Sequence, residues 1–303
     1  MRALVRDELK KLLGERVRFD VPLARLTSLR VGGPVEAVAA PAHRDELLAL
    51  LRTCSELQIP QRVLGNGFNV LALDEGLPGI VIRLTRFREL ETLPAGLRAE
   101  AGVSHSQITR RCCEQGLAGL EFAAGIPGSV GGWLAMNAGI PQREIKDVVL
   151  EVEVASPDGG RVRRTKVREL DFGYRELRGL APGSVLLSAL FHVTQGSAES
   201  VRTAVNSLLA KRARSQPLDV PSCGSVFKNP AGDHAGRMLE AAGLKGFRVG
   251  GAQISPVHAN FIANTGGATS GDVLALIREA RQRVLEMTGQ QLDTEVHVLG
   301  GAV

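Results

Sequence analysis

The chain has 303 residues, of which 44% are hydrophobic and only 4% aromatic. Such a chain can bury an aliphatic core in one large domain or a few smaller ones, which excludes a disordered or low-complexity protein. The net charge of +5 fits either attraction to an anionic partner or an arginine-rich solvated surface. Because no basic and aromatic stripe of an RNA-binding module accompanies the arginines, a small anionic ligand is favoured over nucleic acid.

Targeting and metal-binding patterns are missing from the sequence. No stretch approaches the roughly 20 uncharged apolar residues of a membrane span, and the charged N-terminus lacks the apolar region of a signal peptide. The cysteines form no CxxC pair and no His/Cys spacing suited to zinc: Cys54, Cys112, Cys113 and Cys223. We therefore expect a cytoplasmic protein in a reducing compartment, with no membrane segment and no structural metal.

The first third of the chain predicts helices and strands in alternation. Leu9, Leu12 and Leu13 form the apolar face of the first helix, and Ser104 with Gln107 forms a capping box for the last one. The expected elements are a helix at 3–13 that stops at Gly14, a strand at 35–39, a helix at 45–51, strands at 62–64, 80–84 and 97–101, and a helix from 104 to Gly116.

The middle of the chain is rich in expected strands. Apolar residues alternate with glutamates over a half-buried strand, Val148, Leu150, Val152 and Val154 against Glu151 and Glu153. A Pro-Asp-Gly-Gly turn at 157–160 leads into 162–167 and predicts a hairpin. The nearly continuous apolar run at 185–194 predicts a central strand.

The last third predicts two long helices and a boundary near Gly196. The first helix carries the apolar residues Val201, Val205, Leu208 and Leu209 and ends in a basic turn at 211–214. The second begins near Thr269, has Asp272 at its third position and ends at Gly289, with an apolar stripe of Val273, Ile277, Ala280, Val284 and Met287. The predicted fold class is α+β.

Two glycine-rich loops are the main candidates for ligand binding. The first, Leu64-Gly65-Asn66-Gly67-Phe68-Asn69-Val70, offers backbone N–H groups to an anion such as a pyrophosphate, although a tight turn is the commoner explanation of such a loop. It is neither a Rossmann fingerprint, because Val70 replaces the third glycine, nor a Walker loop. The second is Gly125-Ile126-Pro127-Gly128-Ser129-Val130-Gly131-Gly132, followed by Trp133-Leu134-Ala135-Met136-Asn137-Ala138-Gly139, and it suits a flat extended ligand. Ser129 is no hydrolase nucleophile, since Pro127 occupies a required glycine position.

Both loops resemble the FAD-binding loops of the UDP-N-acetylenolpyruvoylglucosamine reductases. The resemblance implies a vanillyl-alcohol-oxidase type (PCMH-type) FAD-binding domain of two α+β subdomains, followed by a C-terminal α+β substrate-binding domain. It implies an N-terminal helix at 1–20, an FAD-binding region at 21–196 with subdomains at roughly 21–86 and 87–196, and a substrate domain at 197–303. FAD is held non-covalently in this family, so His105 is best interpreted as an ordinary helix-entry histidine rather than a flavin attachment point.

The resemblance also implies an active centre of Arg175, Ser225 and Glu295. In the family reaction NADPH reduces the flavin, which passes hydride to the β-carbon of an enolpyruvyl group on UDP-N-acetylglucosamine. Arg175 and a protonated Glu295 would stabilise the negative charge on the substrate carboxylate, and Ser225 would protonate the α-carbon. Taken singly, each residue has an ordinary explanation: a surface arginine, a turn serine, and an exposed glutamate in a short strand.

A further block resembles the family's substrate-binding signature. It runs from Gly243 to Ser255 and continues through His258 to Asn264. His258 is better explained by a structural role, since the family chemistry does not require it. The candidate substrate-binding residues are Tyr174, Lys228, Asn229, Arg248, Gln253, His258 and Asn260.

Two departures from the family pattern stand near Arg175. The family commonly has a serine two residues after the Tyr-Arg pair, but here Glu176-Leu177-Arg178 follows Arg175. The sequence therefore does not predict how the residues around Arg175 pack. Tyr174 is the only tyrosine, and few residues separate it from the 185–194 strand, so we expect the branch without a tyrosine lid.

Three functions are compatible with these features. The first is an FAD- and NADPH-dependent reductase of peptidoglycan precursor synthesis, acting as a cytoplasmic monomer. The second is another flavin-dependent oxidoreductase of the same superfamily, which oxygen consumption in the absence of NADPH would indicate. The third is a nucleic-acid-binding protein, which would be colourless and bind with steep salt dependence.

Overall fold

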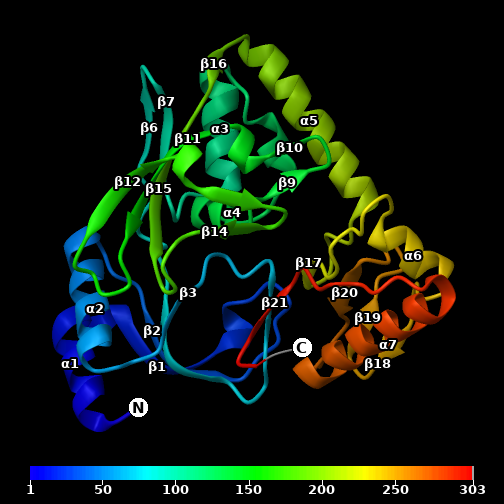
Figure 1. Ribbon diagram of the computed structural model, residues 1–303, viewed down its shortest axis with the longest axis horizontal. Helices are drawn as coiled ribbons and strands as arrows, with labels where there is room; N and C mark the ends of the chain where they lie inside the picture. Colours follow the sequence, from blue (N-terminus) through cyan, green and yellow to red (C-terminus); the bar gives the residue numbers. More distant parts are fainter. Residues whose placement is uncertain (302–303) are drawn as a thin grey trace. The chain divides into compact units, whose positions relative to one another are not determined.

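A computed structural model describes residues 1–301 and separates them into two units, each with a core of its own (Figure 1). Unit 1 comprises Met1–Phe19, Ala37–Gly65 and Gly79–Lys211, and unit 2 comprises Asp20–Glu36, Asn66–Pro78 and the chain from Arg212 on. Each unit is built from separate stretches of the chain. Unit 2 includes two early segments because their residues Leu29, Val31 and Leu71 share a core with residues of the C-terminal third. No local pattern in the sequence indicates this grouping.

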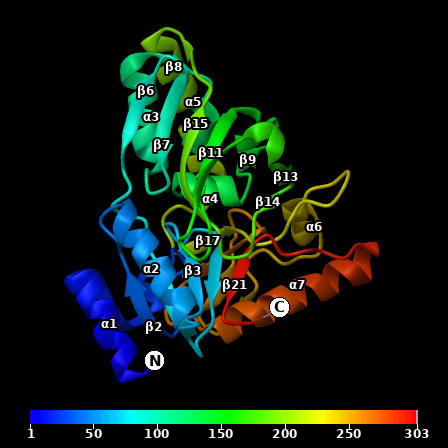
Figure 2. The same ribbon diagram turned by 60° about the vertical axis from the view of Figure 1, so that its left-hand side comes forward.

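Near the N-terminus, two helices pack against a four-stranded sheet. Helices α1 (Ala3–Leu13) and α2 (Arg44–Glu56) lie side by side in Figures 1 and 2. The sheet has the order β1-β2-β5-β3, with β1 (Val17–Pro22), β2 (Pro34–Ala39), β5 (Leu77–Ile82) and β3 (Gln61–Val63). Leu9 and Leu13 are fully buried, as the predicted apolar face requires, and the core they enter also holds Leu47 and Ile80.

The second part of unit 1 is an antiparallel sheet in the order β12-β11-β15-β7-β6. Its strands are β12 (Val162–Lys166), β11 (Val149–Ala155), β15 (Val185–Phe191), β7 (Gly96–Glu100) and β6 (Leu90–Leu93). The predicted hairpin of β11 with β12 is confirmed, and β15 occupies the centre as predicted. The capping box of Ser104 and Gln107 is confirmed at the start of α3 (His105–Gln115), which ends at Gly116 with φ +65°.

The predicted face alternation of β11 is wrong at two residues. Leu150 is exposed, whereas Glu153 is 5% exposed. Register shifts between Val149 and Glu151, and again between Glu153 and Val154, change which side chains point inward. The buried Glu153 carboxylate accepts from the Arg44 guanidinium at 3.1 and 2.5 Å and from the Ser188 hydroxyl at 3.3 Å.

Unit 2 contains an antiparallel sheet in the order β17-β20-β19-β18 and a parallel pair of β21 with β4. The strands are β17 (Ser222–Ser225), β20 (Phe261–Asn264), β19 (Ala252–Ile254), β18 (Arg248–Val249), β21 (His297–Leu299) and β4 (Val70–Ala72). Helices α6 (Ala235–Ala241) and α7 (Ser270–Thr288) complete the unit.

Helix α7 begins and ends where the sequence predicts. Thr269 and Asp272 form its capping box, and Gly289 ends it in the left-handed conformation with φ +69°. Most of the predicted apolar stripe is buried, but Met287 is 48% exposed, so the stripe is wrong at that residue. The helix has run past the core by then, because Leu285 is also exposed.

Helix α5 (Ala198–Ser215) passes from unit 1 into unit 2 after Lys211. Val201 and Val205 of its predicted stripe are buried, while Leu209 is exposed. The remaining elements are short: α4 (Val130–Ala135), β8 (Leu117–Ala118) paired with β16 (Thr194–Gln195), β9 (Gly139–Ile140) with β10 (Arg143–Glu144), and β13 (Asp171–Gly173) with β14 (Glu176–Arg178).

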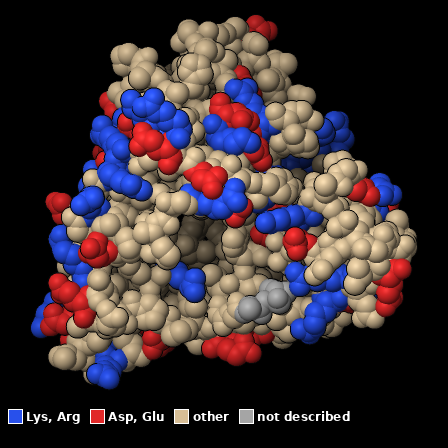
Figure 3. Space-filling model, viewed as in Figure 1, with Lys and Arg blue, Asp and Glu red and all other residues tan. Residues whose placement is uncertain are grey.

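The surface shows basic and acidic side chains intermingled. On the face drawn in Figure 3, lysines and arginines alternate with aspartates and glutamates instead of gathering in one basic patch. Among residues 1–301, no helix is long and apolar enough to cross a membrane. The net charge therefore agrees with the solvated-surface interpretation on this face.

Candidate active site

The first glycine loop continues from the end of β3. The N–H of Leu64 donates to the Ile82 carbonyl of the neighbouring strand at 3.0 Å. Farther along, the Gly67 carbonyl accepts from both the N–H and the hydroxyl of Ser28, at 2.9 and 3.0 Å. Gly67 has φ +69°, and a Cβ there would stand 2.3 Å from the Leu26 carbonyl oxygen, so this glycine is required by the fold itself.

The second glycine loop packs on the end of β7. The N–H groups of Val130 and Gly131 donate to the carbonyls of Val103 and Ala101 at 3.0 and 2.9 Å. A Cβ at Gly131 would lie 3.1 Å from the Ala101 Cβ, so packing explains this glycine too. The loop then turns directly into helix α4, and the chain before it is held by the Trp133 indole, which donates to the Ile126 carbonyl at 3.3 Å.

Other glycines of the second loop are not explained by protein packing. A Cβ at Gly125 or Gly132 would meet no protein atom closer than 3.9 or 3.8 Å, whereas Gly128 has φ +128°, a conformation that itself favours glycine. Gly132 lies inside α4, where glycine costs about 1 kcal/mol relative to alanine. These positions leave a strip of backbone uncovered by side chains, and such a cradle fits the close approach of a flat, extended dinucleotide such as FAD.

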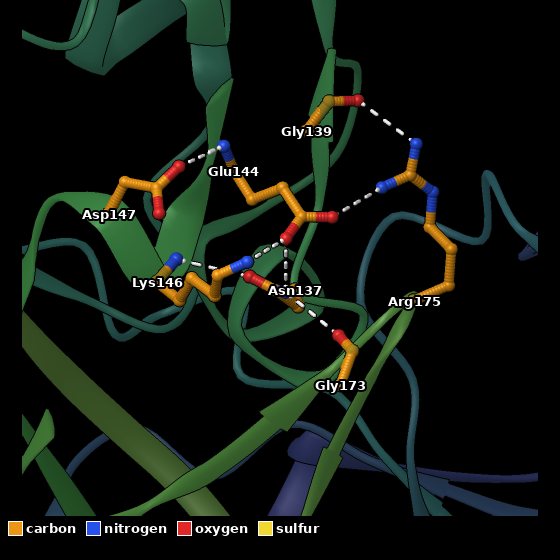
Figure 4. A network of polar contacts seen from close by, with 7 residues as sticks. All are labelled: Asn137, Gly139, Glu144, Lys146, Asp147, Gly173 and Arg175. Atoms are coloured by element: carbon orange, nitrogen blue, oxygen red, sulfur yellow. Dashed lines mark hydrogen bonds and ion pairs between the residues drawn. The ribbon is translucent and has the colours of Figure 1, made fainter. Parts of the chain in front are cut away.

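Asn137 connects the second glycine loop to the hairpin of β13 and β14. Its side chain is fully buried, and its backbone has φ +39°. The side-chain amide donates to Glu144 Oε2 at 2.9 Å and to the Gly173 carbonyl at 2.8 Å, while its oxygen accepts from the Lys146 N–H at 3.1 Å (Figure 4). Every polar atom of this amide is therefore engaged in holding the loop to the hairpin.

Arg175 stands in the two-residue turn between β13 and β14. Its backbone has φ +61°, which is unusual for a residue with a side chain. The guanidinium lies 3.5 Å from Glu144 Oε1 and donates to the Gly139 carbonyl at 3.3 Å (Figure 4), and it covers the Tyr174 ring at 4.8 Å. The arginine predicted for the active centre thus contacts a residue of the second glycine loop.

The departure from the family pattern after Arg175 forms strand β14. Leu177 pairs with Phe172 across the hairpin, and the Arg178 guanidinium lies 3.1 Å from the exposed Asp171 carboxylate. The unusual residues therefore close the hairpin through their own pairing, and the Glu176 carboxylate lies 3.5 Å from the Arg178 guanidinium.

Ser225 and Glu295 come together in unit 2. The Glu295 N–H donates at 2.7 Å to the carbonyl of Val226, the residue after Ser225. The Asn69 side-chain amide of the first glycine loop donates to the Glu295 carbonyl at 3.1 Å. The strand expected around Glu295 is wrong: β21 begins only at His297, and Glu295 lies in the irregular segment before it. Arg175 belongs to unit 1, so the three residues are divided between the units.

Six of the seven expected substrate-binding residues lie in unit 2, and the seventh, Tyr174, lies beside Arg175 in unit 1. The Asn260 amide is buried and bonds to both the N–H and the carbonyl of Phe227, at 2.9 and 2.8 Å. Asn229 accepts from the Ala235 N–H at 3.0 Å, ahead of α6. On β18 and β19, Arg248 donates to the Gln253 side chain at 3.1 Å, and both residues pair in register.

His258 has mainly structural contacts. Its Nδ1 accepts from the Asn260 N–H at 3.2 Å, and its ring packs on Phe261 at 5.0 Å. Burial lowers the pKa of His258, and the nearby Lys245 charge lowers it further. The imidazole is therefore neutral near pH 7 and accepts a backbone hydrogen bond.

Glu144 and Ser28 are the site residues that the sequence interpretation missed. Glu144 belongs to Arg143-Glu144-Ile145-Lys146-Asp147, where alternating charges resemble an ordinary solvated turn. Only its spatial neighbours, Asn137 and Arg175, distinguish it. Among residues 1–301, no cluster of His, Cys, Asp or Glu is placed to hold a metal ion.

Comparison with known proteins first defines the class. Residues 35–165 match the family model of an FAD binding domain, in agreement with the two α+β parts that carry the glycine loops. The predicted α+β class with an FAD-binding domain is therefore confirmed.

The comparison then defines the family. Residues 216–299 match the C-terminal domain of UDP-N-acetylenolpyruvoylglucosamine reductase. Reductases of that name from Anaeromyxobacter sp. (strain K) and Geotalea uraniireducens are 46% and 41% identical, each over 97% of this chain and over 89% and 98% of their own lengths. The crystal structure of the Thermus caldophilus enzyme has a TM-score of 0.81 and 37% identity, covering 93% of this chain and 99% of that one. The chain belongs to the UDP-N-acetylenolpyruvoylglucosamine reductase family.

Proposed function

We propose that the chain reduces UDP-N-acetylglucosamine enolpyruvate to UDP-N-acetylmuramate, with FAD as cofactor and NADPH as reductant. Relatives that match it almost end to end carry this activity in their names. The observation that carries the proposal is the contact between Arg175 and the Gly139 carbonyl, which joins a carboxylate-binding side chain to a loop suited to FAD. When bound, FAD accepts hydride from NADPH and delivers it to the enol ether.

The two glycine loops are proposed to hold FAD. The backbone at Gly125 and Gly132 supports this, because a Cβ at either position would meet no protein atom closer than 3.8 Å. The proposed cofactor-binding residues are Leu64, Gly65, Asn66, Gly67, Phe68, Asn69, Val70, Gly125, Ile126, Pro127, Gly128, Ser129, Gly132, Asn137, Ala138 and Gly139. Asn137 would act by fixing the loop, since its own amide is engaged within the protein.

Arg175 is proposed to bind the substrate carboxylate. Hydride addition at the β-carbon pushes negative charge onto the carboxylate that is conjugated to the double bond. A guanidinium held in advance stabilises this charge without reorganising during the reaction. The side chain is only 15% exposed, so its charge is weakly screened by water.

Ser225 and Glu295 are proposed to complete the reaction. Ser225 would deliver a proton to the α-carbon, and Glu295, in its protonated form, would donate to the growing negative charge. The hydrogen bond from Glu295 to Val226 supports a joint role, because it fixes the two segments against each other. A serine hydroxyl is a weak acid in water, so the assignment requires an activating pocket.

The C-terminal segment is proposed to bind the UDP part of the substrate. Lys228, Asn229, Arg248 and Gln253 would supply donors to the diphosphate and sugar, and Tyr174 would contribute from beside Arg175. His258 and Asn260 would act indirectly, since His258 accepts from the Asn260 N–H and the Asn260 amide holds the Phe227 backbone. The functional division into an N-terminal helix, an FAD-binding region to 196 and a substrate domain from 197 is part of the same proposal.

Location and assembly are also proposals. The enzyme would act in the cytoplasm as a monomer, on a small-molecule UDP-sugar, without nucleic acid or membrane partners. The intermingled charges of Figure 3 support the lack of a nucleic-acid partner on that face.

A steady-state assay tests the proposed function. NADPH oxidation should require UDP-N-acetylglucosamine enolpyruvate, and mass spectrometry should identify UDP-N-acetylmuramate as the product. Oxygen consumption on an alcohol or sugar in the absence of NADPH would instead indicate a flavin oxidase of the same fold.

A further inference from the structure

Glu144 lies between the second glycine loop and Arg175, and its two carboxylate oxygens have different partners (Figure 4). Oε2 accepts from the Asn137 amide at 2.9 Å and from the Lys146 ammonium at 2.5 Å. Oε1 faces the Arg175 guanidinium at 3.5 Å. The side chain is 18% exposed, so it occupies a partly dry position.

The placement of Arg175 needs such support. A left-handed backbone costs a residue with a side chain about 1 kcal/mol or more, and surrounding contacts must offset this. Two of the contacts of the guanidinium, to Glu144 Oε1 and to the Gly139 carbonyl, are 3.5 and 3.3 Å long. Both exceed the usual length of a charge-assisted hydrogen bond. They orient the guanidinium without forming a tight ion pair.

The two oxygens of Glu144 hold two different cations. Lys146 makes the shorter contact with the carboxylate, and the hydrogen bond to Glu144 raises the pKa of Lys146. The other oxygen faces Arg175, whose guanidinium also donates to the Gly139 carbonyl. Glu144 therefore fixes the guanidinium relative to the second glycine loop before a substrate carboxylate arrives.

We infer that Glu144 is the positioning residue for Arg175, fixing the guanidinium to the second glycine loop at the orientation that receives the substrate carboxylate. The inference rests on the proposed role of Arg175. Glu144 acts on the substrate through Arg175, so its loss weakens substrate binding and turnover together. The flavin stays bound, because Asn137 keeps its contacts with the Gly173 carbonyl and the Lys146 N–H and still holds the loop.

The test replaces Glu144 in the flavin-loaded enzyme. Glu144→Gln keeps the shape of the side chain but removes its charge. The amide presents either an NH2 donor or an uncharged carbonyl to Arg175, and neither holds the guanidinium in its orientation. We expect the KM for UDP-N-acetylglucosamine enolpyruvate to rise and kcat to fall, each by about tenfold. Flavin content and the rate at which NADPH bleaches the flavin should change by less than about twofold.

Two matched variants separate positioning from folding. Glu176→Gln makes the same change in the same hairpin, at an exposed carboxylate that pairs with Arg178, and should leave turnover at the wild-type value. Glu144→Asp retains the charge and should recover part of the activity. If Glu144→Gln does not fold, the Asp variant still tests the inference through its KM.

A double-variant cycle decides whether the effect passes through Arg175. In an Arg175→Met background, Glu144→Gln should slow turnover by no more than about twofold, because the group it positions is already gone. Fully additive losses, or an unchanged KM in the single variant, would overturn the inference. A wild-type enzyme that does not turn over the enolpyruvate would refute the proposed function instead, so the two failures are distinguishable.

Discussion

The N–H of Glu295 donates to the carbonyl oxygen of Val226 at 2.7 Å. Val226 directly follows Ser225 in the chain, so this hydrogen bond holds Glu295 next to the segment that carries Ser225. The Val226 N–H in turn donates to the Asn260 carbonyl at 2.9 Å. Ser225, the last residue of β17, and Glu295 lie 70 residues apart in sequence and are thereby parts of one small structure in unit 2. The proposed proton donor and its neighbour therefore cannot shift independently.

Ser225→Ala should separate the two halves of the reaction. NADPH should still bleach the flavin, whereas recovery of the oxidised flavin by UDP-N-acetylglucosamine enolpyruvate should slow by at least about a hundredfold, as expected for loss of a positioned acid. Stopped-flow absorbance measures both rates. Ser222→Ala, three residues earlier in β17, is the matched control. Unchanged turnover in Ser225→Ala would remove this serine from the mechanism.

Arg175→Lys should slow the same second half of the reaction by about tenfold or more. An ammonium cannot reproduce the guanidinium fork, and lysine would lose the simultaneous contacts to Glu144 and Gly139. Arg178→Lys tests the same change on the outer strand of the hairpin and should have little effect. If Arg175→Lys slowed only the bleaching by NADPH, the proposed role of Arg175 would be wrong.

Gly132→Ala should have opposite effects on folding and on cofactor binding. Alanine is the better residue inside α4 by about 1 kcal/mol, and its Cβ would meet no protein atom within 3.8 Å, so the flavin-free protein should be no less stable. FAD affinity should fall, because the methyl group fills the strip proposed for the cofactor. Thermal unfolding and flavin fluorescence titration report the two quantities.

Gly131→Ala is the control for the thermal unfolding and FAD titration of Gly132→Ala. Its Cβ would come within 3.1 Å of the Ala101 Cβ, so it should lower the melting temperature of the flavin-free protein as well. A Gly132→Ala protein that keeps wild-type FAD affinity would show that the strip near α4 does not face the cofactor.

Arg44→Ala should destabilise unit 1 by about 2 kcal/mol. Glu153 is buried on β11 and would lose its two-pronged contact with Arg44, leaving a carboxylate poorly compensated. The estimate is reduced from that of a fully buried pair because the Arg44 side chain is 46% exposed. Urea unfolding measures the change. A loss below about 0.5 kcal/mol would show that Arg164 or water replaces the contact.

Features with local causes could be predicted from the sequence. The capping boxes at Ser104 and Thr269 and the helix end at Gly289 depend on residues within one turn of one another, and all three are confirmed. The hairpin of β11 and β12 was predicted for the same reason, since its turn residues are adjacent in the chain.

Features that depend on residues distant in the chain could not be predicted from the sequence. The register shifts in β11 exchange the environments of Leu150 and Glu153, and they arise from pairing with β15 rather than from β11 itself. Glu144 looks like one more charged turn residue until Asn137 and Arg175 are placed beside it. The site residues were found by resemblance, because Arg175, Ser225 and Glu295 have no local pattern that sets them apart.

The most direct test of the account is an anaerobic stopped-flow spectrum of the purified protein in two mixing steps. NADPH should bleach the visible flavin absorbance, and UDP-N-acetylglucosamine enolpyruvate added next should restore it. A protein that bleaches with NADPH but does not recover with the enolpyruvate would contradict the proposed substrate, and a protein that binds no flavin would contradict the whole account.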